Sequence, residues 1–367
     1  MNNMNKPFRV LSLDGGGIRG LYSAALLQQL TVRIARLTPD AAEERLDLGA
    51  KFDLIAGTST GSIIAVALAA GLPLEDVVEM YRRDSRDIFQ RPMPLKGSCL
   101  SSARRLLWTL HNLPSAANRS GALRRALTAV LREETLGQLF KRRGIGLCVP
   151  SVDAETGRGW VFKTPHTRRL TRDNNYQLVD VCMASAAAPI YFPLHRIPSP
   201  NPGSKAVHSF VDGGLWANNP VMVALAEALE LAGDREIQII SVGTCSGAQS
   251  QPLTDKDADR GVWGWKGGAD IVSASLESQA YTTPYLASTV VKALGRRVTM
   301  YRMQEPETSD EESKHLALDA VDEKSLRLLE MLAHRATDKN VSDLTNTNLT
   351  PEKAMVLDVF SGLAQVN

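Results

Sequence analysis

Near the start of the chain, the spacing of the hydrophobic positions alternates between that of a strand and that of a helix. The apolar run Phe8–Asp14 predicts a strand, and residues 21–37 carry apolar side chains at helical spacing. The order then repeats, with a strand expected at 52–56 and a helix of small residues at 62–70 that Gly71 ends. Two strand–turn–helix units in succession predict an α/β fold, in which helices flank a central, mainly parallel sheet.

Helical spacing continues from residue 73 to about 143, where three prolines interrupt it: Pro92, Pro94 and Pro114. We expect a helical insertion there, because proline cannot continue a helix. Further strands are expected at 145–152, 160–163, 208–211 and 237–242, and further helices at 178–187 and 221–231. The pattern therefore predicts a sheet-based core over residues 8–245.

Residues 246–367 are expected to form an extension that packs on this core. Residues 246–266 are polar and predict a loop, and residues 272–294 predict a helix that is kinked or divided at Pro284. The other expected elements of the extension are a strand at 298–304, an acidic loop at 305–313 and a helix at 322–337.

The composition is that of a globular protein with an aliphatic interior, since 44% of residues are apolar, 22% charged and 5% aromatic. We expect reduced, mostly buried thiols and no zinc or redox motif, because the cysteines are scattered singly at Cys99, Cys148, Cys182 and Cys245. The apolar stretch 62–74 is well short of the about 20 residues of a membrane span, and no secretory segment is apparent. A cytoplasmic protein is therefore expected.

The formal charge of +2 hides an asymmetry along the chain. Residues 82–172 contain 19 Lys and Arg against 6 Asp and Glu, and the remainder contains 23 against 34. Such asymmetry favours an anionic partner, such as a membrane surface, a nucleotide or a nucleic acid. The alternative is a solvated helical face.

The first candidate for chemistry is the glycine-rich segment Asp14-Gly-Gly-Gly-Ile-Arg-Gly20, between a strand and a helix. Glycines at this position let successive N–H groups point into one concavity at the positive end of the helix, so an anion is expected there. The segment also matches the dinucleotide pattern G-x-G-x-x-G, but the second strand ends in another glycine turn where that fold has an acidic residue. A plain glycine turn without a ligand is the alternative.

The second candidate is Gly57-Thr-Ser-Thr-Gly61, which matches the nucleophile elbow G-x-S-x-G. The elbow requires a strand before it and a helix after it, and both are predicted here. Small residues at Gly57 and Gly61 permit the strained turn that lifts the Ser59 hydroxyl out of the sheet. We therefore expect Ser59 to be a catalytic nucleophile.

A serine nucleophile needs a base, and no histidine offers a supportive setting. His315 and His334 come late enough in the chain for a triad, but they follow an acidic loop and end an amphipathic helix, respectively. The others lack a motif: His111, His166, His195 and His208. Asp212 is placed better, because it ends a predicted strand before Gly213 and Gly214, which leave space for a carboxylate to reach the serine.

Together these motifs, with Ser185–Pro193 between the last two, resemble the patatin-like phospholipase family over roughly residues 8–245. The resemblance implies a three-layer fold in which Ser59 is the nucleophile and Asp212 is its dyad base. It also implies that the amides of Gly15, Gly16 and Gly17 form the oxyanion hole and that Arg19 orders this loop. The strand and helix at 298–337 are similar to the tail of many bacterial members.

Within the family, the chain is similar to the cyclic-dinucleotide-activated, CapV-type phospholipases of anti-phage signalling. This resemblance implies fatty-acid release from membrane glycerophospholipids through an acyl-enzyme, at the inner face of the membrane, without metal or other cofactor. It adds a cyclic dinucleotide as activator, allows an oligomer and predicts no nucleic-acid polymer as partner. Basic side chains available for the phosphates of such a ligand are Arg104, Arg105, Arg124 and Arg125.

Alternatives to this hypothesis remain open at the level of sequence. The same arginines could hold the protein against anionic lipid, together with an exposed Trp108. The dyad could serve a constitutive esterase or a peptidase, and the glycine loop could belong to a nucleotide-binding module without enzymatic activity.

Overall fold

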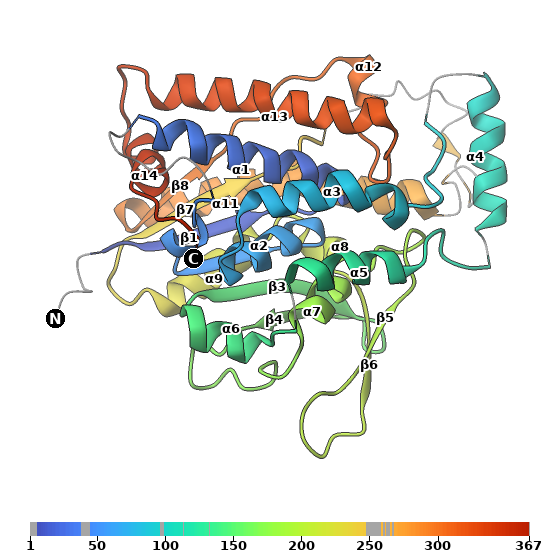
Figure 1. Cartoon of the computed structure of the whole chain (residues 1–367), viewed down its shortest axis with the longest axis horizontal. Helices are drawn as coiled ribbons and strands as arrows, with labels where there is room; N and C mark the ends of the chain where they lie inside the picture. The colour runs from blue at the N-terminus through green and yellow to red at the C-terminus, as the bar shows by residue number, and fades with distance from the viewer. Residues whose placement is uncertain are drawn as a thin grey trace.

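The computed structural model of the chain describes residues 6–37, 45–95, 99–112, 114–131, 133–246, 258–259, 261, 265 and 268–366, with no side chains described at 99–102. Most of the loop expected at 246–266 lies outside these residues. In the part described, a central sheet is covered by helices on both faces (Figure 1).

One sheet contains all the strands of the described residues, in the order β5-β6-β3-β2-β1-β7-β8, with β4 paired to β3. Its strands are β1 (Phe8–Leu13), β2 (Leu54–Gly57), β3 (Gly146–Asp153), β4 (Arg158–Lys163), β5 (His195–Pro198), β6 (Val207–Asp212), β7 (Ile237–Val242) and β8 (Val298–Arg302). The run from β3 through β2, β1 and β7 to β8 is parallel, whereas β4, β5 and β6 add antiparallel pairs at one side. The predicted α/β class with a mainly parallel sheet is confirmed.

Most helices cover one face of the sheet and form the larger core with it. These helices are α1 (Gly20–Ala35), α2 (Thr60–Ala70), α3 (Leu74–Ile88), α5 (Ser120–Leu131), α6 (Leu136–Arg143), α7 (Leu178–Ser185), α13 (Glu323–Leu344) and α14 (Pro351–Phe360). The smaller core lies on the opposite face under α9 (Val221–Leu231) and α11 (Ala269–Leu294). Figure 1 shows α13 lying along α1, and α4 (Cys99–His111) standing apart at one end.

Helix α2 is buried on nearly all sides, which its sequence of small and aliphatic residues allows. It begins directly after β2, and Gly71 ends it in a left-handed conformation. The tight β2–α2 connection places the N-terminus of α2 at the carboxyl edge of the sheet, where β1 and β6 also end. This edge is where ligands bind in open α/β sheets.

The structure contains elements that the sequence did not predict, among them the short helix α8 (Gly214–Ala217). Strand β5 was not predicted, since its four residues end in Pro198 and pair only at the sheet edge. The acidic loop contains the short helix α12 (Asp310–Ser313), which Ser309 and Glu312 cap reciprocally. Helix α14 was also missed, whereas α11 runs as one helix through Pro284.

The extension beyond residue 245 completes the sheet, because β8 pairs in parallel with β7. The expected boundary between a core that ends at residue 245 and a separate extension stays a prediction. Cys148, Cys182 and Cys245 are buried free thiols, and the side chain of Cys99 lies outside the described residues. Among the described helices, none combines the length and the apolar character that crossing a membrane requires.

Candidate active site

Ser59 occupies a strained turn between β2 and α2. Its backbone has φ 53° and ψ −122°, a conformation that non-glycine residues rarely adopt. A side chain on Gly61 would collide with the carbonyl oxygen of Leu13, and one on Gly57 would collide with the backbone of Gly61. The two elbow glycines therefore let α2 approach the end of β1, and Ser59 lies at the point of contact.

Asp212, at the end of β6, is the side-chain partner of Ser59. The Ser59 hydroxyl donates to Asp212 Oδ2 at 2.8 Å, and the Gly214 N–H donates to Asp212 Oδ1 at 2.7 Å. Burial raises the pKa of Asp212 to about 6, although the hydrogen bonds from Gly214 and Ser59 lower it. A carboxylate with a pKa close to neutrality is suited to accept a proton from a serine and to return it.

The histidines lie elsewhere and have other partners. His166 contacts Glu227, His195 contacts Asp180, and His208 packs its ring on Trp160. None of the six is hydrogen-bonded to Ser59 in the part of the chain described here. The arrangement is a serine–aspartate pair.

The last residue of α7 and the segment that follows it hold both members of the pair in place. The Ser59 N–H donates to Ser185 Oγ at 2.8 Å, and the Ser185 hydroxyl in turn donates to the Pro150 carbonyl at 2.6 Å. The Asp212 N–H donates to the Ala187 carbonyl at 3.0 Å. In the sequence, Ser185 stood out only as part of a motif. Its contact with the backbone of Ser59 forms only because the fold brings segments distant in sequence together.

The glycine loop faces the same site with two of its three predicted amides. Gly16 and Gly17 line the pocket beside Ser59, and their N–H groups donate to no backbone carbonyl among the described residues. The Gly15 N–H instead donates to the Asn218 carbonyl at 2.8 Å. An oxyanion-hole role for the Gly15 amide therefore stays a prediction, and this donor is already engaged in the structure.

The Arg19 backbone N–H donates to the Gly16 carbonyl at 3.1 Å, whereas its guanidinium is hydrogen-bonded to no glycine-loop carbonyl among the described residues. Arg19 is almost fully buried, and its Nη1 donates to the Leu316 carbonyl at 3.5 Å, so it connects the loop to the C-terminal extension. Arg302 on β8 is the stronger anchor, because its Nη1 and Nη2 contact the two carboxylate oxygens of Asp14 at 3.0 and 2.7 Å. Sequence analysis missed Arg302, since nothing near it in sequence forms a motif.

A deep apolar pocket of about 660 Å³, including its open mouth, adjoins Ser59. Aliphatic and aromatic side chains from α2, α3, α5 and the segment after α7 dominate its lining, among them Ile63, Ile88, Phe89, Leu123, Tyr191 and Phe192. Such a lining suits a hydrocarbon chain. The polar groups of Ser59 and Asp212 lie in its wall, so a bound chain could present a carbonyl to the serine.

The four arginines considered for anion binding lie on two different helices. Arg104 and Arg105 lie on α4, whereas Arg124 and Arg125 lie on α5. Arg124 forms an ion pair with Asp180. The side chain of Arg125 borders a shallow hollow shared with Arg83 and with two acidic residues, Asp84 and Asp87.

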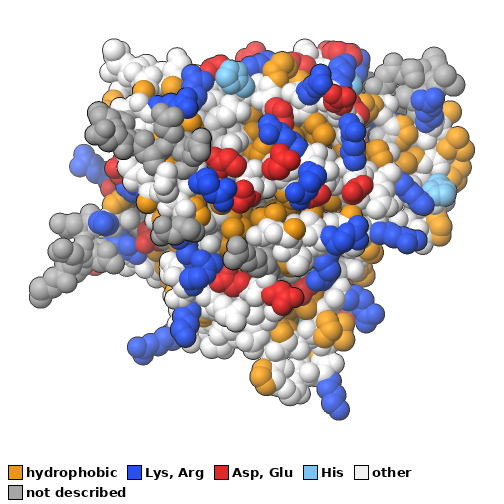
Figure 2. Space-filling model, in the orientation of Figure 1, with side chains coloured by type: hydrophobic (Ala, Val, Ile, Leu, Met, Phe, Trp, Pro, Cys, Tyr) orange, Lys and Arg blue, Asp and Glu red, His pale blue; other side chains and the backbone are white. Residues whose placement is uncertain are grey.

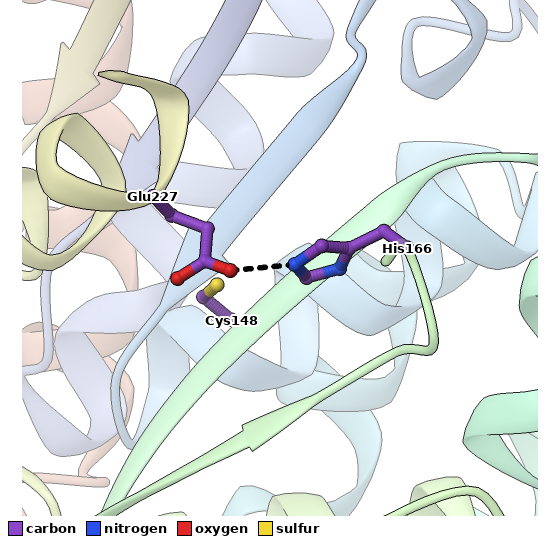
Figure 3. A group of neighbouring side chains, drawn as sticks. All are labelled: Cys148, His166 and Glu227. Carbon is purple, nitrogen blue, oxygen red and sulfur yellow. Dashed lines mark hydrogen bonds and ion pairs between the residues drawn. The ribbon is translucent and has the colours of Figure 1, made fainter. Parts of the chain in front are cut away.

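Sequence spacing also gave no sign of a buried cluster formed by Cys148, His166 and Glu227 (Figure 3). Their potential metal-ligand atoms all lie within 4.8 Å of one another, and His166 Nε2 is 2.8 Å from a Glu227 oxygen. The ammonium of Lys163 contacts the other Glu227 oxygen, so the cluster contains its own cation. Burial raises the pKa of Cys148, which opposes the thiolate form that a metal requires.

Comparisons with known proteins match the sequence of this chain to a family. A family model described as patatin-like phospholipase matches residues 11–225. A Pseudomonas aeruginosa protein named cGAMP-activated phospholipase is 31% identical over 343 residues, which cover 92% of this chain and 90% of that protein. Proteins of the same name from Escherichia coli and Vibrio cholerae are 33% and 30% identical, over 66% and 76% of this chain and 63% and 76% of their own lengths.

Proposed function

The chain belongs to the patatin-like phospholipase family, and on that premise we propose that it releases fatty acids from membrane glycerophospholipids through Ser59 and Asp212. The observation that supports this proposal best is the 2.8 Å hydrogen bond from the Ser59 hydroxyl to Asp212, in the wall of an apolar pocket. The enzyme is a lipid-hydrolysing esterase, and the dyad is the proposed source of its activity.

In the proposed mechanism, Ser59 Oγ attacks the carbonyl carbon of the ester while Asp212 Oδ2 accepts the hydroxyl proton. The tetrahedral intermediate collapses, the ester bond breaks, and the proton passes from Asp212 to the departing lysophospholipid alcohol. Water then attacks the acyl-enzyme with Asp212 as base, and the fatty acid leaves as Ser59 regains its proton. Every step uses groups of this chain, so a chelator should leave the rate unchanged.

The amides of Gly16 and Gly17 are the proposed donors to the oxyanion. They lie beside Ser59 at the N-terminal end of the α1 region, where the helix dipole adds positive potential. Backbone donors fixed before the reaction stabilise the oxyanion without reorganisation. Arg302 and the Leu318 carbonyl, which accepts the Ile18 N–H at 2.8 Å, support the loop from the C-terminal extension.

A cyclic dinucleotide is the proposed activator, and anti-phage defence is the proposed role. Relatives named cGAMP-activated phospholipases over most of this chain support this part. An enzyme that hydrolyses the inner face of its own membrane must rest until a signal arrives, which a soluble ligand can provide. A role of Arg104, Arg105, Arg124 and Arg125 in binding the activator stays a prediction, and among them Arg124 is already paired with Asp180.

The test measures fatty-acid release from phosphatidylglycerol-containing vesicles by the purified protein and by Ser59→Ala, each with and without cGAMP. We expect release only from the protein with Ser59, and a higher rate with cGAMP. Turnover of soluble esters but not of vesicles would support a small-ester hydrolase or a peptidase. Nucleotide binding by Ser59→Ala, with no hydrolysis by the natural protein, would support a binding module.

A further inference from the structure

Helix α4 exposes an apolar face to solvent and turns a more polar face toward the protein, which is the reverse of the usual arrangement. The face turned toward the protein carries mostly polar or amphipathic side chains: Arg105, Trp108, Thr109 and Asn112. The face turned outward carries three exposed leucines, with 50% of Leu106, 65% of Leu107 and 42% of Leu110 accessible to solvent. These leucines fall within one narrow arc, because positions three and four apart share a face of a helix.

Specific contacts fix this orientation. The Trp108 indole N–H donates to the Arg91 carbonyl at 3.0 Å, so Trp108 is partly buried and not exposed as the sequence suggested. The Arg105 guanidinium contacts Met93 Sδ at 2.8 Å, and the Met93 N–H donates to the buried carboxylate of Asp319 at 2.6 Å. Rotating the helix to bury its leucines would break the first two of these contacts.

The inverted helix stands beside the substrate pocket. The Trp108 ring lies 6.3 Å from the ring of Tyr191, which lines the pocket. The chain after α4 pairs with the same pocket segment, since the N–H groups of Ala117 and Asn118 donate to the carbonyls of Ile190 and Tyr191 at 2.8 and 2.9 Å. Figures 1 and 2 show α4 at one end of the molecule, where hydrophobic side chains and basic side chains share the surface.

We propose that the leucine face of α4 is the surface that docks on an anionic phospholipid bilayer. This inference rests on the proposed function and adds the place of contact. An amphipathic helix inserts exposed leucines between lipids while basic side chains meet the headgroups. Docking here brings the membrane against the wall that Trp108 shares with the pocket.

The charge of this region favours an anionic bilayer as the partner of the leucine face. Residues 88–132 contain no Asp or Glu, and the exposed Arg104, on α4, and Arg119, directly before α5, have no ion pair among the described residues. Anionic headgroups attract such a surface, and each basic side chain close to the membrane adds to the attraction. A second copy of the chain would instead place like charges against one another, so a bilayer is the better complement.

The experiment compares the double variant Leu106→Gln/Leu107→Gln with the control Met331→Gln/Leu349→Gln. The control removes two side chains of similar exposure, 46% and 57%, on α13 and the loop after it, away from α4. Glutamine keeps good helix propensity, so α4 should remain folded. Each variant is assayed for co-sedimentation with phosphatidylglycerol-containing vesicles, for fatty-acid release from them with cGAMP present, and for hydrolysis of a monomeric short-chain ester.

We expect the α4 variant to lose at least about tenfold in vesicle binding and vesicle hydrolysis, with ester hydrolysis within about twofold of the natural protein. The control should match the natural protein in all three assays. Unchanged vesicle binding by the α4 variant would overturn the proposal, as would an equal loss in the control or in ester hydrolysis.

Two further outcomes separate this inference from others. If the α4 variant changes the oligomeric state in light scattering and still binds vesicles, the leucines form a contact between copies and the docking proposal fails. If Ser59→Ala still releases fatty acid, the proposed function fails, whereas vesicle binding by that variant still tests the docking surface.

Discussion

Two buried carboxylates beside the same sheet have pKa values that are shifted in opposite directions. Asp212 accepts hydrogen bonds from neutral donors, Ser59 and Gly214, and burial raises its pKa to about 6. Glu227 lies on α9 against the opposite face and contacts Lys163 and His166. Burial alone would raise the pKa of Glu227, but the hydrogen bonds from His166 and Lys163 outweigh it and lower the pKa.

The difference indicates which cluster can do chemistry. Asp212 borders a pocket and forms no ion pair within the described part of the chain, so burial leaves it with a raised affinity for a proton. Glu227 has a hydrogen-bond partner on each oxygen, one of them the ammonium of Lys163, and holds the chain after β4 against α9. A buried acid is therefore a candidate base only where its surroundings leave its charge unpaired.

Removing either member of the dyad should have the largest effect and separates the two carboxylates directly. Ser59→Ala and Asp212→Asn should each lower kcat for ester hydrolysis by about 10⁴-fold or more, and the double variant should be little worse than either, because the residues act as a unit. Glu227→Gln serves as the matched control and should retain the natural rate. Near-natural turnover by Asp212→Asn would remove the aspartate base from the mechanism.

A third buried carboxylate, Asp14, tests how much an ion pair to a buried carboxylate contributes to the free energy of unfolding. Arg302→Met leaves Asp14 buried without its cation and should lower the free energy of unfolding by about 3–5 kcal/mol. Asp14→Asn in the same chain should recover much of this loss, because the uncompensated charge is gone. Chemical denaturation of the natural protein, both single variants and the double variant measures the coupling. Strictly additive effects would show that the pair does not interact.

The raised pKa of Asp212 predicts opposite responses of activity and stability to pH. Activity requires the carboxylate, so kcat should fall about tenfold per pH unit below pH 6. The folded protein binds this proton more tightly than the unfolded chain, so the stabilising contribution is complete below about pH 4 and is lost as pH rises through 6. The shift from 3.8 to about 6 corresponds to roughly 3 kcal/mol.

The asparagine variant makes this stability change measurable, since it cannot ionise. Relative to the natural protein, Asp212→Asn should gain unfolding free energy between pH 4 and pH 7, while it remains inactive throughout. A difference in stability that stays constant over this range would show that burial of Asp212 does not raise its pKa.

The smallest effect is expected at the compensated cluster. Glu227→Gln should lower the free energy of unfolding by about 2 kcal/mol, because Lys163 and His166 lose charge-assisted hydrogen bonds. The folded-state pKa of Glu227 is lowered, so its contribution is present at neutral pH and lost on acidification. Thermal or chemical unfolding at pH 7 and pH 4 measures both. A large loss of activity in the folded variant would mean that this cluster also serves catalysis.

Sequence by itself determined the features that depend on local geometry. The elbow needs small residues at Gly57 and Gly61, because any side chain there would collide with backbone, and that demand is written within five positions. Asp212 was predictable for the same reason, as a carboxylate at a strand end followed by glycines. The strand–turn–helix repeats likewise predicted the α/β class, whereas the short edge strand β5 has too few residues for a period to show.

Tertiary structure decided which distant groups complete or limit these motifs. It engaged the Gly15 amide with Asn218, brought Arg302 to Asp14 across 288 positions, and supplied Ser185 to the backbone of Ser59. It also left the leucine face of α4 exposed, through contacts of the helix with Arg91 and Met93 and through the contact of Met93 with Asp319. Such contacts leave no periodic or local signature in sequence, because each depends on where the sheet and its connections place two separate segments in space.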